Sequence, residues 1–514
     1  MSRRGGNVVD PEKQARIFRL LQRFSPVLSI VLFFVGIAWL LILPYEIYSK
    51  GTYISENALL PGQANVEYGY NDIRTAEDYM HNLLEIQNED NETRAQFIHK
   101  EFRRSGFTSA IQHFTLDDNT KCANAFAIYK APRSDGKEAL ILSTSWMSRT
   151  GEYNTNGIAV LLSLAKLFKR NVYWAKDIIL LVTDQEKLGT QAWLDAYHGM
   201  EEGEFSAIVM PRSGTIQGVI NLDFPGTQDY ETLGIFFEGV NGQLPNLDLI
   251  NTVVAVAERS NPPILITLHD STDHLFSDSK YSRYFRSLFH MLNSMKYLVF
   301  GHPSSDAGLY LKYRIDAITI HGISGSTHLG NLFGYNPGAA IFNIMQPSFG
   351  AKYLTQFSKE QMIHVQFGAS LVVFWTVTLA LVAWISKSAS PEHDGTMLKS
   401  FCLAESALVV ATVSLLNFTL GIATALLISI PYSLTRPSTK LFWKCIQTLV
   451  LAIVSPPGLV TLFGLLTETP FVHIFSTLLF DYQQFGSWFL TFICIVYWPI
   501  NMAMIVLVFT KSLS

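Results

Sequence analysis

Cysteine is scarce in this chain. Its 514 residues include four cysteines, and three of these, Cys402, Cys445 and Cys494, fall in long apolar segments. The more polar part of the chain contains Cys122 alone, so it has no internal disulfide and must be held together by its own apolar core. No motif around Cys122 indicates a nucleophilic cysteine.

Several motifs of common α/β enzymes are also missing. The chain has no G-x-S-x-G sequence, the turn that carries the serine nucleophile of α/β-hydrolases. It has no G-x-G-x-x-G or Walker loop after an apolar strand, so a nucleotide site is not supported. A formal net charge of -4, with no basic stripe in the more polar part, gives no basis for a nucleic-acid partner.

Apolar residues are abundant but unevenly distributed. They make up 49% of the chain and dominate residues 26–43 and 363–509, whereas residues 50–360 have the composition of a soluble domain. The sequence thus predicts one large soluble domain together with an all-α transmembrane bundle.

Residues 26–43 are the first predicted membrane span. They carry no charge and have about the minimum length that crosses the hydrocarbon core. A cleaved signal peptide would have a shorter apolar region followed by small residues, but residues 44–46 are Pro, Tyr and Glu. We therefore expect an uncleaved signal anchor. The basic tail at residues 1–25 then lies in the cytosol, and the domain at 50–360 lies in the lumen of the endoplasmic reticulum (ER).

The carboxyl-terminal region is predicted to be multi-pass. One tilted helix or two shorter ones could occupy the apolar residues between Lys399 and Arg436. Two crossings place Arg436, Lys440 and Lys444 in the cytosol, as the positive-inside rule favours, so we predict two. The predicted spans are residues 363–385, 400–416, 418–434, 441–465 and 485–509.

A glycosylation sequon gives this orientation a test. Asn91 begins an Asn-Glu-Thr sequence in a polar stretch, so it should be modified if the domain is luminal. A second sequon at Asn417 lies inside an apolar run, where we expect the transferase not to reach it.

Residues 138–226 alternate apolar strands with a helix, which is typical of βαβ units. The sequence therefore predicts an α/β domain with a doubly wound, mostly parallel sheet. Asp184 and Asp223 follow two of the predicted strands, at the edge of the sheet where such folds place their sites.

The order of these elements resembles the di-zinc aminopeptidase fold. In that family a His and an Asp end one strand, an acidic residue precedes the next helix, a Glu pair ends a second strand and an Asp ends a third. Here Ser145 and Met147 replace the first His and Asp, and Thr183 replaces the general base. The remnant ligand positions are Glu152, Asp184 and Asp223.

These carboxylates make a poor zinc site. Ala307 replaces the His of an S-D-H motif, and the last His ligand has no secure counterpart, although His321 and His328 lie nearby. A two-metal centre needs imidazole and carboxylate ligands plus a general base. Strand-end aspartates also have a purely structural role, accepting hydrogen bonds from loop amides. We expect no cofactor and no catalytic residue, and residual metal binding stays open.

Several strings are more specific than the fold. They are Gly36–Trp39, Thr52–Asn57, Tyr173–Asp177, Leu188–His198 and Asn241–Asp248. Together they resemble the glycosylphosphatidylinositol (GPI) anchor attachment family, whose members are the aminopeptidase-like, multispan subunit of the GPI transamidase complex. The resemblance covers nearly the whole chain.

This resemblance implies a function. The complex joins the carboxyl end of a precursor protein to a GPI lipid, and its catalytic cysteine belongs to another, caspase-like subunit. The chain would then be a non-catalytic subunit that positions the GPI lipid, with that subunit, the precursor's carboxyl-terminal signal and the membrane as partners. Two other functions stay open. One is a membrane-anchored zinc metallopeptidase or metal-dependent amide-forming subunit, and the other is a receptor-like scaffold.

Two segments next to predicted spans are candidates for contacts to the lipid head group. Tyr53 and Ser55 follow the first span, and Gln346 and Ser348 precede the second. Hydroxyl and amide groups suit a zwitterionic phosphate ester because they donate hydrogen bonds without adding charge. The alternative is that Tyr53 is an interfacial aromatic residue and the others contact solvent.

Overall fold

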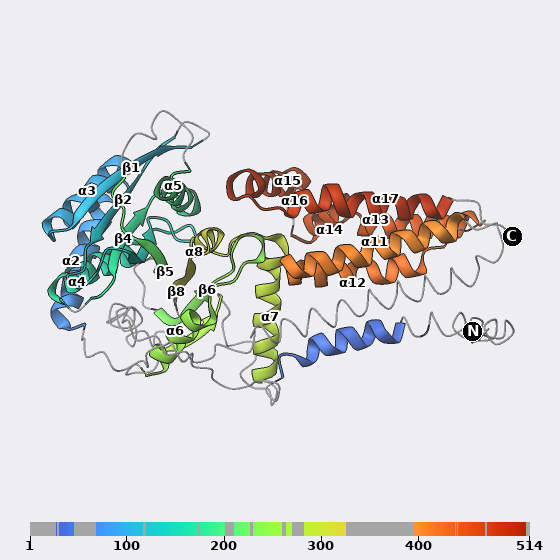
Figure 1. The fold of residues 1–514 in the computed structure, drawn as a ribbon, viewed down its shortest axis with the longest axis horizontal. Helices are drawn as coiled ribbons and strands as arrows, with labels where there is room; N and C mark the ends of the chain where they lie inside the picture. The colour runs from blue at the N-terminus through green and yellow to red at the C-terminus, as the bar shows by residue number, and fades with distance from the viewer. Residues whose placement is uncertain are drawn as a thin grey trace, which may run out of the picture. The chain divides into compact units, whose positions relative to one another are not determined.

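The chain divides into two compact units. In the computed structural model, residues 27, 30–45, 68–116, 120–172, 174–200, 210–226, 230–259, 264–269, 282–324, 394–436, 438, 440–467 and 470–509 are described. The first unit, Glu46–Gln356, is here called the sheet unit. The second unit, Met1–Tyr45 with Phe357–Ser514, is called the helical unit. Figure 1 shows strands in the former and long helices in the latter.

The sheet unit is built around one mixed sheet. Its eight described strands lie in the order β1-β2-β4-β3-β5-β8-β6-β7. They are β1 (Thr108–Thr115), β2 (Lys121–Tyr129), β3 (Glu138–Ser145), β4 (Asp177–Thr183), β5 (Thr215–Asp223), β6 (Tyr230–Phe236), β7 (Leu265–Leu268) and β8 (Asp316–Ser324). Strands β4, β3, β5 and β8 run parallel to one another, and β6 runs parallel to β7.

The flanks of the sheet run the other way. Strand β2 is antiparallel to both β1 and β4, and β6 is antiparallel to β8. The predicted α/β class is confirmed, and the predicted parallel arrangement applies to the centre of the sheet. Five residues separate β1 from β2 in the sequence, and a connection of that length can form only an antiparallel pair.

Helices cover both faces of this sheet. The described helices of the sheet unit are α2 (Tyr70–Ile86), α3 (Asn91–Arg104), α4 (Thr155–Arg170), α5 (Glu186–His198), α6 (Leu247–Arg259), α7 (Ser282–Phe300) and α8 (Ala307–Tyr310). Figure 1 shows α2, α3 and α4 on one side of the sheet, with α5 and α8 on the other.

The central strands and helix α4 form the core of the sheet unit. Every residue of β4 is buried, as expected for a parallel strand that is covered on both faces. Helix α4 buries an apolar face that includes Leu161, Leu164 and Phe168, each fully shielded from solvent. Asn154 caps this helix by accepting a hydrogen bond from the Gly157 amide.

The helical unit contains paired and broken apolar helices. Helices α11 (Asp394–Leu416) and α12 (Phe418–Leu434) meet at Asn417, whose side chain accepts a hydrogen bond from the Leu420 amide. Helices α13 (Leu441–Val454) and α14 (Pro456–Thr467) bend by 71° at their junction. Helices α15 (Phe471–Phe480), α16 (Phe489–Thr491) and α17 (Trp498–Phe509) follow, separated by π-helical turns.

Among the described residues, two helices are long and apolar enough to cross a membrane, or three if the bent pair counts as one span. A shorter apolar helix covers Ile30–Ile42, within predicted span 26–43. The predicted span at 363–385 lies outside the described residues. Membrane crossing by the segments 400–416, 418–434, 441–465 and 485–509 stays a prediction.

Candidate functional site

The carboxyl ends of the parallel strands lie along one edge of the sheet. Ser145, Thr183 and Asp223 end β3, β4 and β5. Ser145 is paired with Thr183 across β3 and β4. Asp223 is paired with His321 across β5 and β8. The parallel sheet thus brings together side chains that are far apart in the sequence, as the pattern of strands predicted.

Asp223 and His321 form a buried pair. The Asp223 Oδ2 atom lies 2.9 Å from His321 Nδ1, and both side chains are almost wholly shielded from solvent. The other carboxylate oxygen, Oδ1, is buried and has no hydrogen-bond partner among the described residues. Asp223 therefore has the imidazole neighbour for which the sequence offered no secure counterpart.

Asp184 has a different neighbour. Its Oδ1 atom accepts a hydrogen bond from Arg94 Nη2 at 3.1 Å, and both side chains are buried. The Asp184 amide donates to the side chain of Asn124 on β2 at 2.9 Å. Burial raises the pKa of the Asp184 carboxyl above its ordinary value, and the Arg94 charge opposes that rise. These contacts tie the end of β4 to α3 and β2.

Two further carboxylates are electrostatically coupled to Asp223. Burial raises the pKa of Glu186, and the negative charge of Asp223 adds to that rise. Burial also raises the pKa of Asp306 to about 8, with Glu186 and Asp223 contributing repulsion and Lys187 opposing it. No motif in the sequence singles out Glu186. Its backbone φ of 47° is uncommon for a residue with a side chain, but the sequence does not show this.

The residues at the predicted ligand positions make structural contacts. Ser145 Oγ accepts a hydrogen bond from the Glu186 amide at 3.1 Å. Thr183 Oγ1 donates to the Thr144 carbonyl at 3.4 Å. Met147 pairs with Tyr153 in an isolated bridge. Glu152, the third remnant position, is exposed, so it does not join the buried carboxylates.

The described residues do not fit a two-metal centre. No group of three or more His, Cys, Asp or Glu side chains among them is arranged to hold a metal ion. Of the remnant positions, Asp184 is paired with a cation and Asp223 with an imidazole. A di-zinc site needs several such ligands converging on metals about 3.5–4 Å apart. Among the described residues, the strand-end side chains therefore do not form such a ligand set.

A second buried charged cluster lies near the ends of β6 and β7. Glu238 Oε1 lies 2.8 Å from His269 Nε2 and accepts a hydrogen bond from Ser294 of α7 at 2.6 Å. Burial alone would raise the pKa of Glu238, but His269 and the hydrogen-bonding serines lower it below its ordinary value. The His269 ring stacks on Tyr297, with centroids 5.4 Å apart. No sequence motif pointed to this cluster, because its members lie on separate elements.

Of the other predicted site residues, the structure describes Asn91 but not the four candidate lipid-contact residues. Tyr53, Ser55, Gln346 and Ser348 lie outside the described residues, so their contact with lipid stays a prediction. Asn91 is half-buried at the start of α3, and its Nδ2 atom donates to the Lys121 carbonyl at 3.1 Å. Its glycosylation stays a prediction too.

The fold and the strand-end residues define a class, an α/β domain with a mixed sheet in a chain that also carries membrane-type apolar helices. The family model described as "Gaa1-like, GPI transamidase component" matches residues 121–334 and 326–505. This chain belongs to that family of GPI transamidase components. The predicted family is therefore confirmed, and the chain is a membrane protein.

Two yeast proteins are similar to this chain. "GPI transamidase component gaa1" of Schizosaccharomyces pombe is 29% identical over 60% of this chain and 54% of its own length. "GPI transamidase component GAA1" of Saccharomyces cerevisiae is 30% identical over 54% of this chain and 42% of its own length. The chain thus matches about half the length of these relatives.

Solved structures resemble part of this chain at low identity. A Zn-dependent exopeptidase of Bacteroides vulgatus is 16% identical, with a TM-score of 0.35, and the match covers 56% of this chain and 99% of that chain. A glutaminyl cyclase of Porphyromonas gingivalis is 13% identical, with a TM-score of 0.32, over 61% of this chain and 99% of that chain.

Proposed function

We propose that this chain is a non-catalytic subunit of the GPI transamidase complex of the ER membrane. In this role it positions the GPI lipid while another, caspase-like subunit supplies the catalytic cysteine. The proposal rests on family membership and on the chemistry of the strand-end residues. The complex acts on the carboxyl-terminal signal of precursor proteins, so those precursors are the proposed protein substrates.

The observation that carries the non-catalytic part is the use of the strand-end side chains. Ser145 and Thr183 make hydrogen bonds to backbone groups, where a peptidase of this kind would need a ligand and a general base. Asp184 is paired with Arg94 inside the protein. Side chains engaged in this way support the packing of loops, and this use of the former ligand and base positions supports the proposed non-catalytic role.

The rest of the proposal concerns placement and lipid contact. We propose that the amino terminus is cytosolic, that the sheet unit is luminal and that the helical unit crosses the membrane several times. The apolar helices of the helical unit support the membrane part of this arrangement. Residues Tyr53, Ser55, Gln346 and Ser348 are proposed to contact the phosphoethanolamine head of the lipid from segments next to the membrane.

A cell experiment tests the subunit role. Depleting this chain should remove GPI-anchored proteins from the cell surface, as measured by flow cytometry of a GPI-anchored reporter. Re-expression of the wild type or of Thr183→Ala should restore the reporter, because Thr183 is proposed to have no catalytic role. An unchanged reporter after depletion contradicts the subunit role, and failure of a normally expressed Thr183→Ala variant contradicts the non-catalytic role.

Metal analysis tests the alternative of a zinc metallopeptidase or metal-dependent amide-forming subunit. The purified full chain is analysed by mass spectrometry for bound zinc, alongside Asp223→Asn and the exposed control Asp135→Asn. We expect no stoichiometric zinc in any of them. About two zinc ions per chain, lost in Asp223→Asn together with reporter anchoring but kept in the control, would establish the metal-dependent alternative.

A further inference from the structure

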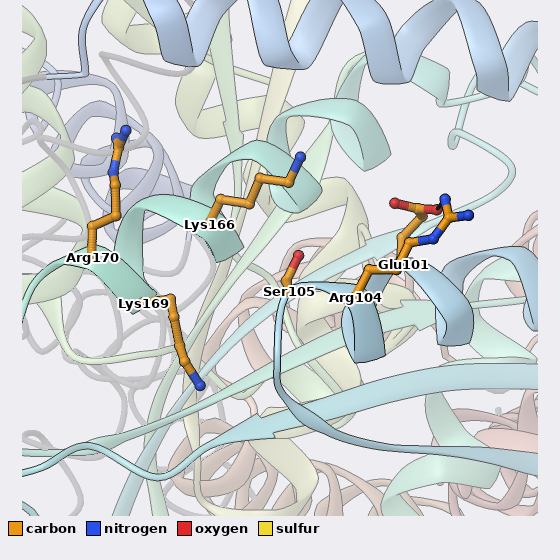
Figure 2. A pocket seen from close by; sticks show the side chains of 6 residues that line it. All are labelled: Glu101, Arg104, Ser105, Lys166, Lys169 and Arg170. Atoms are coloured by element: carbon orange, nitrogen blue, oxygen red, sulfur yellow. Dashed lines mark hydrogen bonds and ion pairs between the residues drawn. The ribbon is translucent and has the colours of Figure 1, made fainter.

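A basic pocket lies where the carboxyl-terminal ends of α3 and α4 converge. It encloses about 540 Å³. Its lining residues are Glu101, Arg104 and Ser105 from the end of α3, and Lys166, Lys169 and Arg170 from α4. Figure 2 shows the three α4 side chains on one side of the pocket and the three α3 residues on the other.

The charge of this pocket differs in sign from that of the whole protein. Four of its lining residues are cations and one is an anion, which leaves an excess of three positive charges. The complete chain has a formal net charge of -4. Cations held close together repel one another, so a bound anion would stabilise this arrangement.

The four cations differ in whether they form ion pairs. Arg104 is ion-paired with Glu101, and Arg170 is ion-paired with Asp72 at the start of α2. Neither Lys166 nor Lys169 has a carboxylate partner among the described residues. Both lysines are exposed. The pocket therefore contains two ammonium groups whose charge no described carboxylate neutralises.

Both lysines are nevertheless held in place. The Lys166 ammonium lies 4.5 Å from the ring centroid of Tyr79. The Lys169 ammonium donates to the Gly106 carbonyl at 2.7 Å and lies 5.4 Å from the ring centroid of Phe107. An ammonium has three donor hydrogens, so Lys169 keeps two for a ligand. Such contacts restrict the side chains and reduce the entropy lost when a ligand binds.

Helix-dipole compensation explains only part of this pattern. Lys169 and Arg170 lie in the last turn of α4, and Arg104 lies in the last turn of α3, where cations stabilise the carbonyl end of a helix. Lys166 lies one turn earlier and faces the pocket. A dipole effect can occur at the end of a single isolated helix. It therefore does not explain why these cations line a pocket between two helices.

We propose that this pocket binds a phosphate-bearing ligand. Lysines are point-charge partners for phosphate oxygens, and the Ser105 hydroxyl lines the opposite side of the pocket. The volume is in the range of small-molecule sites and exceeds what a bare phosphate fills. A water-soluble phosphate ester and a phospholipid head group share this chemistry. An acidic protein segment is a less suitable partner, because the cations surround a pocket and do not follow an extended groove.

The test measures binding to the full chain in an uncharged detergent. The probes are inorganic phosphate, glucose 6-phosphate, a short-chain phosphatidylinositol phosphate in mixed micelles, and an acidic polyglutamate peptide, followed by calorimetry at two salt concentrations. The variants are Lys166→Gln, Lys169→Gln and the double variant. Lys312→Gln is the matched control, since Lys312 is exposed and also lies near a tyrosine ring, outside the pocket.

We expect saturable binding of a phosphate probe that weakens with salt. Each single lysine variant should lose about tenfold in affinity and the double variant about a hundredfold, while Lys312→Gln binds like the wild type. Tighter binding of the micellar lipid than of glucose 6-phosphate identifies a lipid head group as the source, and the reverse identifies a soluble ester. Lys166→Gln alone keeps the test valid if the double variant does not fold.

Three results would overturn the proposal. The first is that none of the phosphate probes binds. The second is that Lys166→Gln and Lys312→Gln bind equally well. The third is that polyglutamate binds more tightly than every phosphate probe and depends on the same lysines, which would make this pocket a protein-docking surface. None of these results bears on the transamidase role, because reporter anchoring is measured separately.

Discussion

Arg94 on α3 and Asp184 at the end of β4 form a buried ion pair, with Nη2 and Oδ1 3.1 Å apart. The Arg94 guanidinium also lies 5.0 Å from the ring centroid of Trp146, which follows β3. One arginine thus holds together a helix and the ends of two central strands. Asp184, which the fold resemblance suggests as a remnant metal ligand, is used here as the partner of that arginine.

Removing Arg94 should destabilise the sheet unit strongly. Arg94→Met leaves the Asp184 carboxylate buried without its cation, and losing one partner of a buried pair costs about 3–5 kcal/mol. Denaturant unfolding of the full chain in detergent measures this loss. Arg103→Met is the control, because Arg103 is exposed on the same helix and should change the unfolding free energy little. Equal effects of the two substitutions would contradict a structural role for the pair.

The buried carboxyl of Asp306 should make stability depend on pH. Its pKa is raised from 3.8 to about 8, so the folded chain keeps a proton that the unfolded chain releases between these values. The unfolded state binds fewer protons in this window, and the free energy of unfolding therefore falls as pH rises from about 4 to about 8.

Asp306→Asn should reduce this slope and make the chain more stable than the wild type at the alkaline end of the window. Thermal unfolding measured across the pH range checks the prediction. Asp135→Asn is the control, because the pKa of exposed Asp135 is lowered by hydrogen bonds from Lys137 and so lies below the window. An unchanged slope in Asp306→Asn would mean that the carboxyl is ionised in the folded chain.

Gly189 in α5 should not accept a larger side chain. A Cβ at this position would lie 1.8 Å from the carbonyl oxygen of Asp184 and 2.9 Å from Asn124 Oδ1. Gly189→Ala must therefore displace the end of β4, and overpacking of this kind costs about 1–3 kcal/mol. Gly69→Ala is the matched control, since its Cβ would meet no atom within 4 Å. The midpoint of denaturant unfolding should fall for Gly189→Ala only.

Glycosylation tests the proposed luminal placement of the sheet unit. In a eukaryotic secretory cell, the wild-type chain should carry one glycan at Asn91, so Asn91→Gln should migrate faster on a gel and no longer respond to endoglycosidase. Asn417→Gln should migrate like the wild type, because Asn417 is buried and caps α12. An unglycosylated wild-type chain would contradict the luminal placement, and a shift in Asn417→Gln would contradict the predicted spans nearby.

The sequence predicted those structural features that depend on the pattern of neighbouring residues. Apolar runs predicted the central strands β3, β4 and β5, because a strand buried on both faces must be apolar along its whole length. Helix α5 and helix α15 were not predicted. Helix α15 has ten residues, too few for a membrane span, so its apolar character did not mark it as one.

The sequence does not show which side chains pair with one another in the candidate site. Arg94 and Asp184 are 90 residues apart, and Asp223 and His321 are 98 residues apart. Hydrophobic periodicity reports the face of an element but not which distant side chain will face it. The same holds for the basic pocket, whose cations come from α3 and α4, two helices that three strands separate in the sequence.

The sequence by itself determined the α/β class, the family and the loss of the peptidase-type ligands, since Ser145, Met147 and Thr183 are visible without a structure. The tertiary structure decided what the remaining acids do. It pairs Asp184 with a cation and Asp223 with an imidazole, and it groups Glu186 and Asp306 with Asp223. The physical reason is that the energy of a buried charge depends on its neighbours in space. The crossover connections of the mixed sheet determine which residues become those neighbours.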